Sequence, residues 1–486
     1  MADNINFLCE IGTEEIPAGY IPPAVNAIRE YMAKSLEQER LSYGNINVYA
    51  TPRRLAVLVS DMADMQSADE EELKGPSIKA AYDEQGNPAK PLQGFMKGNN
   101  IALEDIYTKS TDKGEYIFAS RKREAHPASE IIPGIIEKML FAIPFPKRMR
   151  WSNKKIAFPR PISYFCVLLN DTIISHEIEG IPFGNKIRGH YVQHNEMVEV
   201  TSVSKYIEIL ESKGVMVDQD GRREMIRKQL KETVDAIKGE LIEDEELLDT
   251  VTYLTEWPYV VVCDFDPDFL EIPDIVLITE MKEHQKYFAV NSPGGGLMSR
   301  FLVISNNPPN ENIKQGNERV IAARFSDARF FFQEDRKTAL SDKVDQLKDV
   351  LFHKDLGSIY DKVTRMKTIS AEAAGILDID KNTREKIDRA VTLSKADLNT
   401  SMVFEFTSLQ GEMGKIYATL DGENPEVAAA IDEHYRPRFQ GDELPSSMVS
   451  IIPSLAEKID NIFGSFSVGN IPKGSQDPYA LRRQAA

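Results

Sequence analysis

The stretch INFLCEI at residues 5–11 decides the fold at the start of the chain. It is a short and mostly apolar run, which is typical of a buried β-strand. A helix is predicted from Pro22 to about Arg40, because two prolines suit a helix start and apolar residues then recur at helical spacing. Residues 46–62 predict a second strand that is broken near Pro52. The chain therefore begins with alternating strands and helices.

The rest of the chain predicts hairpins first and helices afterwards. Three hairpins are expected, with turns at residues 112–114, 170–171 and 293–296. After about residue 310, apolar residues recur almost entirely at helical spacing.

The predicted fold class is a multidomain α and β protein. It has an N-terminal α/β (α+β) body with mixed sheets and hairpins, followed by an all-helical domain. The expected divisions are an α+β body at 1–200, a second α+β region with a helical connector at 201–335, and the helical domain at 336–486.

The composition is that of a large acidic protein. It has 486 residues, too many for one hydrophobic core, and a net charge of −18. That charge argues against nucleic-acid binding, although a local basic patch is enough for it. The three cysteines lie far apart among apolar residues, so reduced core thiols are expected. With no apolar run long enough to span a bilayer and no signal peptide, we expect a cytoplasmic protein without membrane contact.

Motifs for nucleotide and metal chemistry are missing from the sequence. There is no GxxxxGKS/T loop and no GxGxxG after a strand, and turn chemistry explains the glycine run at 294–296. His190 and His194 lie four residues apart, but no third metal ligand is obvious nearby. No cysteine has a histidine close in sequence, and there is no GxSxG elbow. We therefore expect no catalytic residue, no metal site and no cofactor in this chain.

The positive signal is a basic segment that contains aromatic residues. Residues 147–160 read KRMRWSNKKIAFPR, with no acidic residue among them. Lysine and arginine neutralise phosphates, and an aromatic ring stacks on an unpaired base. The alternative is a solvated loop with a tryptophan in the core, and both interpretations stay open. The candidate RNA-binding residues, including a second pair in TPRRLAV, are Arg53, Arg54, Lys147, Arg148, Arg150, Trp151, Lys154, Lys155 and Arg160.

Several blocks along the chain carry a family resemblance in their joint order. They include FLCEIGTEEIPAGY (7–20), TPRRLAV (51–57), MRWSNKKIAFPRPISY (149–164), GNERVIAARFSDARFFFQEDRK (316–337) and DPYALRRQA (477–485). Together they resemble the β subunit of the bacterial two-subunit glycyl-tRNA synthetase.

The resemblance implies an α2β2 assembly with divided tasks. The small α subunit is expected to carry the class II catalytic domain with ATP and Mg, and the β subunit to bind tRNA-Gly. The helical region after about residue 335 resembles an HD-type domain. The comparable helix here reads LSKADLNTSMVFEF, without the adjacent His-Asp pair of HD phosphohydrolases, so we expect a degenerate domain. The family continues past DPYALRR into an anticodon-binding domain, so we expect a fragment that lacks it.

Three hypotheses follow for the function. The first is a tRNA-binding subunit of glycine–tRNA ligase that is not catalytic alone. The second is an independent HD-type metal phosphohydrolase, which needs clustered ligands that the sequence does not show. The third is an architectural subunit that organises the α subunit with little RNA contact. The charge of −18 favours the third and the segment 147–160 opposes it, and we favour the first.

Overall fold

The computed structural model describes residues 4–486 except for residues 68, 84, 85, 113, 124, 475 and 478. The chain folds into two compact units. The first unit comprises Met1–Ile237, Glu243–Val261 and Ile304–Asn310, and the second unit comprises Lys238–Ile242, Val262–Val303 and Glu311–Ala486. Helices and several sheets occur together, which confirms the predicted mixed α and β class.

The first unit is built on a seven-stranded sheet in the order β2-β3-β1-β7-β10-β9, with β8 paired to β7. Strand β1 is antiparallel to both neighbours, so that Cys9 lies opposite Val57 of β3 and Val167 of β7. The predicted first strand, the break near Pro52 and the turn at 170–171 are confirmed. The strands are β1 (Asn4–Thr13), β2 (Ile46–Thr51), β3 (Arg54–Ala63), β7 (Ile162–Leu169), β8 (Thr172–Ile173), β9 (Glu177–Ile178) and β10 (Ile181–Gly184).

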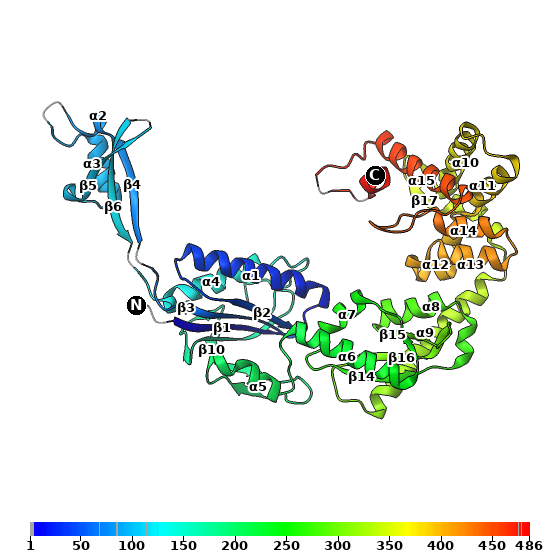
Figure 1. Ribbon diagram of the computed structural model, residues 1–486, viewed down its shortest axis with the longest axis horizontal. Helices are drawn as coiled ribbons and strands as arrows, with labels where there is room; N and C mark the ends of the chain where they lie inside the picture. Colours follow the sequence, from blue (N-terminus) through cyan, green and yellow to red (C-terminus); the bar gives the residue numbers. More distant parts are fainter. Residues whose placement is uncertain are drawn as a thin grey trace. The chain divides into compact units, whose positions relative to one another are not determined.

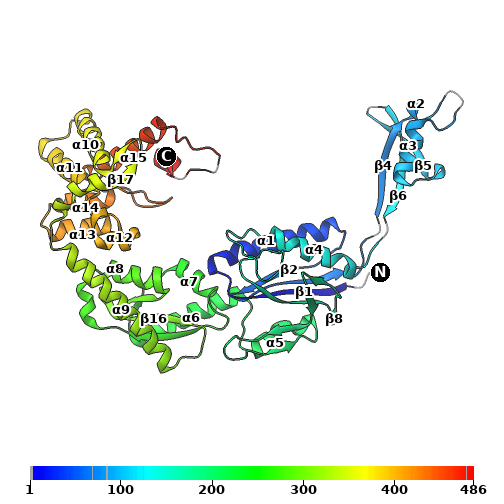
Figure 2. The same ribbon diagram turned by 180° about the vertical axis from the view of Figure 1, so that it is seen from behind.

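Helices cover both faces of this sheet. Successive strand residues point to opposite faces, so Phe7 and Cys9 join the core under α1 and α4, while Leu8 joins the core with α5. Figures 1 and 2 show α1 and α4 on one face and α5 on the other. Glu10 lies two residues after Leu8 in the same strand, so its side chain points to the same face of the sheet, the one covered by α5. The helices are α1 (Ile21–Gln38), α4 (Ala128–Ala142) and α5 (Tyr206–Ser212).

A small lobe lies in the sequence between β3 and α4. It has a three-stranded sheet in the order β4-β6-β5 and a core that contains Ala81, Leu92 and Ile117. Strands β5 and β6 form the predicted hairpin, whose residue Lys113 lies outside the described residues. The lobe comprises β4 (Asp69–Ser77), α2 (Ile78–Ala81), α3 (Lys90–Asn99), β5 (Ile106–Thr111) and β6 (Gly114–Arg123). The rest of the unit adds β11 (Lys186–Arg188), β12 (Met197–Glu199), α6 (Gln219–Ile237) and α7 (Glu245–Thr252).

The second unit begins with a four-stranded sheet in the order β13-β15-β16-β14. The predicted hairpin is β15–β16, and its turn uses Gly294, Gly295 and Gly296, all with positive φ. The elements are β13 (Glu240–Leu241), β14 (Tyr259–Asp264), α8 (Asp274–Thr279), β15 (Phe288–Asn291), β16 (Leu297–Ser305) and the long helix α9 (Glu311–Asp335).

Helices dominate the remainder of the second unit, as predicted, but one short strand pair interrupts them. Strands β17 (Leu351–His353) and β18 (Gly357–Ser358) pair because Gly357, at a φ of 84°, reverses the chain. The helices are α10 (Ile359–Ile376), α11 (Lys381–Leu393), α12 (Ser401–Glu405), α13 (Glu412–Leu420), α14 (Pro425–Glu433), α15 (Met448–Ser467) and α16 (Leu481–Ala485).

Candidate nucleic-acid interface

The basic segment, residues 147–160, connects α4 to β7 in the first unit. A single bridge closes it: the N–H of Met149 donates to the oxygen of Phe158 at 2.8 Å, and the reverse bond measures 3.1 Å. Phe158 is fully buried and packs edge-on against Phe145, with ring centres 4.9 Å apart. The segment is therefore anchored in the core, and Phe158 is not free to stack on a base.

The six cations of the basic segment lie at the surface. All are exposed except Lys154, which is half-buried. Their contacts are with main-chain oxygens: Arg148 donates to the end of α4 (3.3 Å), Lys154 to Glu179, and Arg160 to Glu15 (3.0 Å). Within the described part of the chain, none of the six side chains forms an ion pair with a carboxylate, although the main-chain N–H of Lys155 donates to the Glu179 carboxylate at 3.1 Å. Their side chains are therefore not held in ion pairs and can contact an external anion such as phosphate.

Trp151 has a mixed position in this segment. Its ring is half-buried and packs against the hydrophobic core of the first unit. This packing is what the alternative interpretation, a core tryptophan in a solvated loop, predicts. Only the exposed part of the ring remains for contact with a base.

Arg53 lies at the turn between β2 and β3, close to the surface. Its guanidinium pairs with Glu14 at 2.7 Å and Glu15 at 3.1 Å, and it lies 3.7 Å from the ring centre of Tyr191. Both carboxylates are more than half exposed, so each pair contributes only about 0–1 kcal/mol. A phosphate can replace such partners, and Arg53 stays a candidate.

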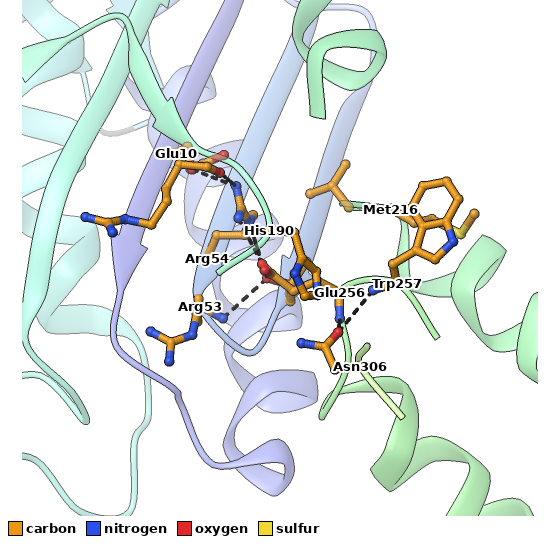
Figure 3. A network of polar contacts seen from close by, with 12 residues as sticks. Glu10, Arg53, Arg54, His190, Met216, Glu256, Trp257 and Asn306 are labelled. Atoms are coloured by element: carbon orange, nitrogen blue, oxygen red, sulfur yellow. Dashed lines mark hydrogen bonds and ion pairs between the residues drawn. The ribbon is translucent and has the colours of Figure 1, made fainter. Parts of the chain in front are cut away.

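Arg54 is enclosed by the protein instead of facing solvent. It is 1 % exposed, and Figure 3 shows its guanidinium between Glu10 and Glu256. The distances are 2.9 Å to Glu256 and 3.4 Å to Glu10, and a further N–H donates to the main-chain oxygen of Arg188 at 2.9 Å. This burial corrects the expected RNA contact by Arg54, because no phosphate can approach a guanidinium whose donors are already bound inside the fold.

The ionised state of this buried network follows from its partners. Glu10 also accepts hydrogen bonds from Tyr164 at 2.5 Å and from Tyr206, and Glu256 accepts one from Thr51 at 2.9 Å. Burial opposes the charge on Arg54, but Glu256 and Glu10 hold the pKa of Arg54 well above its ordinary value. Burial likewise opposes the charge on Glu256, yet Arg54 lowers the pKa of Glu256. The group is a charged cluster that joins distant segments of the first unit.

The cluster also fixes the chain around Glu256. The main-chain N–H groups of Glu256 and Trp257 donate to Asn306 at 2.6 and 3.2 Å, and the oxygen of Glu256 accepts from Met216 at 2.9 Å (Figure 3). Sequence reasoning missed Glu256, which lies 202 positions from Arg54. The sequence did contain one sign of a buried ion pair: Glu10 lies inside an otherwise apolar strand, and a buried carboxylate needs a cation as its partner.

Other polar groups do not assemble into a metal site. Among the residues that the structure describes, no three His, Cys, Asp or Glu side chains gather so as to hold a metal ion. His190 is fully buried, and its Nδ1 accepts from the main-chain N–H groups of Val192 and Gln193 at 3.3 and 3.2 Å. The cysteines are buried free thiols, as predicted.

No helix in the described ranges is long and apolar enough to cross a membrane.

Comparison with known proteins gives one consistent family. A family profile described as "Glycyl-tRNA synthetase beta subunit" matches residues 7–486. The chain is 44 % identical to the glycine–tRNA ligase beta subunit of Clostridioides difficile over 482 residues, which cover 98 % of this chain and 70 % of the relative. It is 43 % identical to that of Syntrophotalea carbinolica over 478 residues, with 98 % and 69 % covered. The chain therefore belongs to the glycyl-tRNA synthetase β-subunit family, whose members are subunits of an aminoacyl-tRNA synthetase.

Proposed function

We propose that this chain binds tRNA-Gly and positions it for aminoacylation on a partner α subunit. The observation that carries the proposal is the basic segment, in which six surface cations have no carboxylate partner within the described part of the chain. In a chain with a net charge of −18, uncompensated positive charge in one segment favours a polyanion at that place and disfavours it elsewhere.

In this proposal the catalytic steps belong to the partner. Glycine activation with ATP and Mg takes place on the α subunit of an α2β2 cytoplasmic assembly, and this chain supplies no catalytic residue. The support is the absence from this sequence of a phosphate-binding loop and of the class I and class II synthetase signatures. The helical region at 336–486 is, in the same proposal, a degenerate HD-type domain without hydrolase activity.

The structure sharpens the choice of residues for a test. Arg148, Lys154 and Arg160 each donate to a main-chain oxygen, so changing them also disturbs the fold of the segment. Lys147, Arg150 and Lys155 are exposed and carry no such side-chain contact within the described residues. The triple variant Lys147→Glu, Arg150→Glu, Lys155→Glu is expected to weaken tRNA-Gly binding at least about tenfold and to flatten its salt dependence, because each lost phosphate contact removes released counterions.

A matched control changes the same number of exposed cations elsewhere. Lys205, Lys228 and Lys381 each already face a glutamate three or four residues away, at Glu208, Glu232 and Glu385. Their change to glutamate alters the net charge almost identically and is expected to leave specific tRNA affinity nearer to the parent value. Equal losses in the two triple variants, measured by filter binding, would assign the effect to net charge and favour the architectural role.

A further inference from the structure

A cavity lies among the helices of the second unit, bordered by α10, α15 and the chain on either side of them. Its volume is about 270 Å³, and it is partly open to solvent. Its walls are largely apolar and include Phe352, Leu356, Ile359, Leu398 and Val468. Cavities that combine such walls with a few convergent polar groups are typical ligand sites.

The charged groups that line this cavity include two buried lysines and a glutamate, beside neutral polar side chains such as Gln410, Asn461 and Gln484. Lys395 is 3 % exposed and Lys362 is 2 % exposed. The Lys395 ammonium lies 2.5 Å from a carboxylate oxygen of Glu457, and Lys362 lies 3.8 Å from the other one. Lys362 is fully occupied, because it also bonds to Asp460 at 3.1 Å and to Asn461 at 2.6 Å.

Two hydrogen-bond donors in the cavity remain unused. The buried hydroxyl of Tyr435 has no hydrogen-bond partner among the described residues. The Lys395 ammonium has three N–H groups, but its contacts are one carboxylate and the ring face of Tyr435, whose centre is 3.8 Å away. Both residues line the same cavity. A buried donor without an acceptor is unfavourable, so these two donors favour a ligand that supplies acceptor oxygens.

The charges around Lys395 point to the same ligand chemistry. Burial, and then Lys362, lower the pKa of Lys395 to about 8, although Glu457 and Asp397 oppose that shift. The pKa of Glu457 is held well below its ordinary value by Lys395 and Lys362 against the effect of burial. Glu457 pairs with Lys395 and Asp460 pairs with Lys362, so what Lys395 offers a ligand is its remaining N–H groups, from which an oxyanion can accept charge-assisted hydrogen bonds.

We propose that this cavity binds a small organic oxyanion: an apolar or aromatic body that carries one phosphate or carboxylate group. Its oxygens accept hydrogen bonds from Lys395 and Tyr435, and its body lies against the apolar wall at Phe352 and Leu398. The same chemistry is offered by a free molecule and by the terminal nucleotide of an RNA. The site is independent of the basic segment, so its failure and that of the proposed function are separate results.

Isothermal titration calorimetry on the whole chain tests this site. Phenyl phosphate and adenosine 5′-monophosphate are the probes, and phenol and adenosine provide the same bodies without the phosphate group. The acidic probes are expected to bind at least tenfold more tightly than their neutral counterparts. Absence of binding by both acidic probes, or equal binding of acidic and neutral forms, overturns the proposal.

Two variants locate the binding. Tyr435→Phe removes only the unused hydroxyl and is expected to weaken phenyl phosphate binding about five- to tenfold. Lys395→Met is expected to abolish it. Tyr417→Phe is the control, because that buried hydroxyl in the same unit is already bonded to Asp335 at 3.0 Å. Unchanged affinity in Tyr435→Phe contradicts the proposal even if Lys395→Met does not fold. Loss of probe binding on saturation with tRNA-Gly identifies an RNA end as the ligand, and undisturbed binding identifies a free molecule.

Discussion

At the scale of single residues, the neighbours Arg53 and Arg54 have opposite environments. Arg53 is 15 % exposed and pairs with two exposed carboxylates, whereas Arg54 is buried and pairs with two buried carboxylates. The sequence TPRRLAV shows two equal basic residues, and only the strand register separates them. Arg54 opens β3 opposite Gly12, and this places it beside the inward-facing Glu10.

This difference predicts unequal costs of removing the two charges. Arg54→Met leaves Glu10 and Glu256 buried without their cation, and it is expected to destabilise the first unit by about 3–5 kcal/mol. Arg53→Met breaks two pairs with exposed carboxylates and the contact with the Tyr191 ring, and it is expected to cost about 1–2 kcal/mol. Urea unfolding followed by tryptophan fluorescence measures both values. Similar stabilities for the two variants would contradict the structural role of Arg54.

A second residue-scale prediction concerns His434, which is fully buried. Burial, and then Lys395, lower the pKa of His434 from 6.5 to about 4. Because the folded pKa lies below the unfolded one, its contribution to stability is present above pH 6.5 and is lost as the pH falls from 6.5 towards 4. The ring is therefore expected to stay neutral at pH 5.5. Carbon-13 histidine NMR, assigned with His434→Gln, checks this, and a His434 signal that titrates between pH 5.5 and 7.5 would refute it.

At the scale of elements, the close packing of β1 against β7 depends on Gly12. A Cβ at Gly12 would lie 2.2 Å from the ring of Tyr164, whose hydroxyl donates to Glu10. Gly12→Ala is expected to displace this ring and to cost about 1–3 kcal/mol. Gly19→Ala is the control, because nothing lies within 4 Å of its added Cβ. Thermal unfolding of both variants gives the comparison, and equal midpoints would show that the contact is not rigid.

The elements themselves were largely predictable because their signals are local. Strand β1 and helix α1 follow from apolar patterning and from the prolines at a helix start, and the hairpin at β15–β16 follows from its glycines. The pair β17–β18 was missed because each strand has only two or three residues, too few for a period.

The candidate site was only partly predictable, because its contacts join residues that lie far apart in the sequence. Surface cations in 147–160 could be read from the sequence, but burial of Arg54 and Phe158 depends on partners far along the chain. Nothing in the sequence near Arg54 indicates that Glu256 completes its pairing. Likewise, the cavity at Lys395 joins α10, α15 and residues around 395, a combination that no local pattern reveals.

At the scale of the whole molecule, the negative net charge of the chain is compatible with a binding role for the basic segment. In the proposed function, a net charge of −18 disfavours RNA over most of the surface and so makes binding at the basic segment selective. The chain covers 70 % of the length of the Clostridioides difficile relative, which is therefore the longer protein.

The most direct test of the central claim is the affinity of this chain for tRNA-Gly across a potassium chloride series, alone and with the α subunit. The account predicts that the logarithm of affinity falls linearly with the logarithm of salt concentration, with a slope of about −2 to −4 for three to six phosphate contacts, and that the α subunit tightens binding. Binding that is absent in both states, or that does not respond to salt, would contradict an RNA-positioning role for the basic segment.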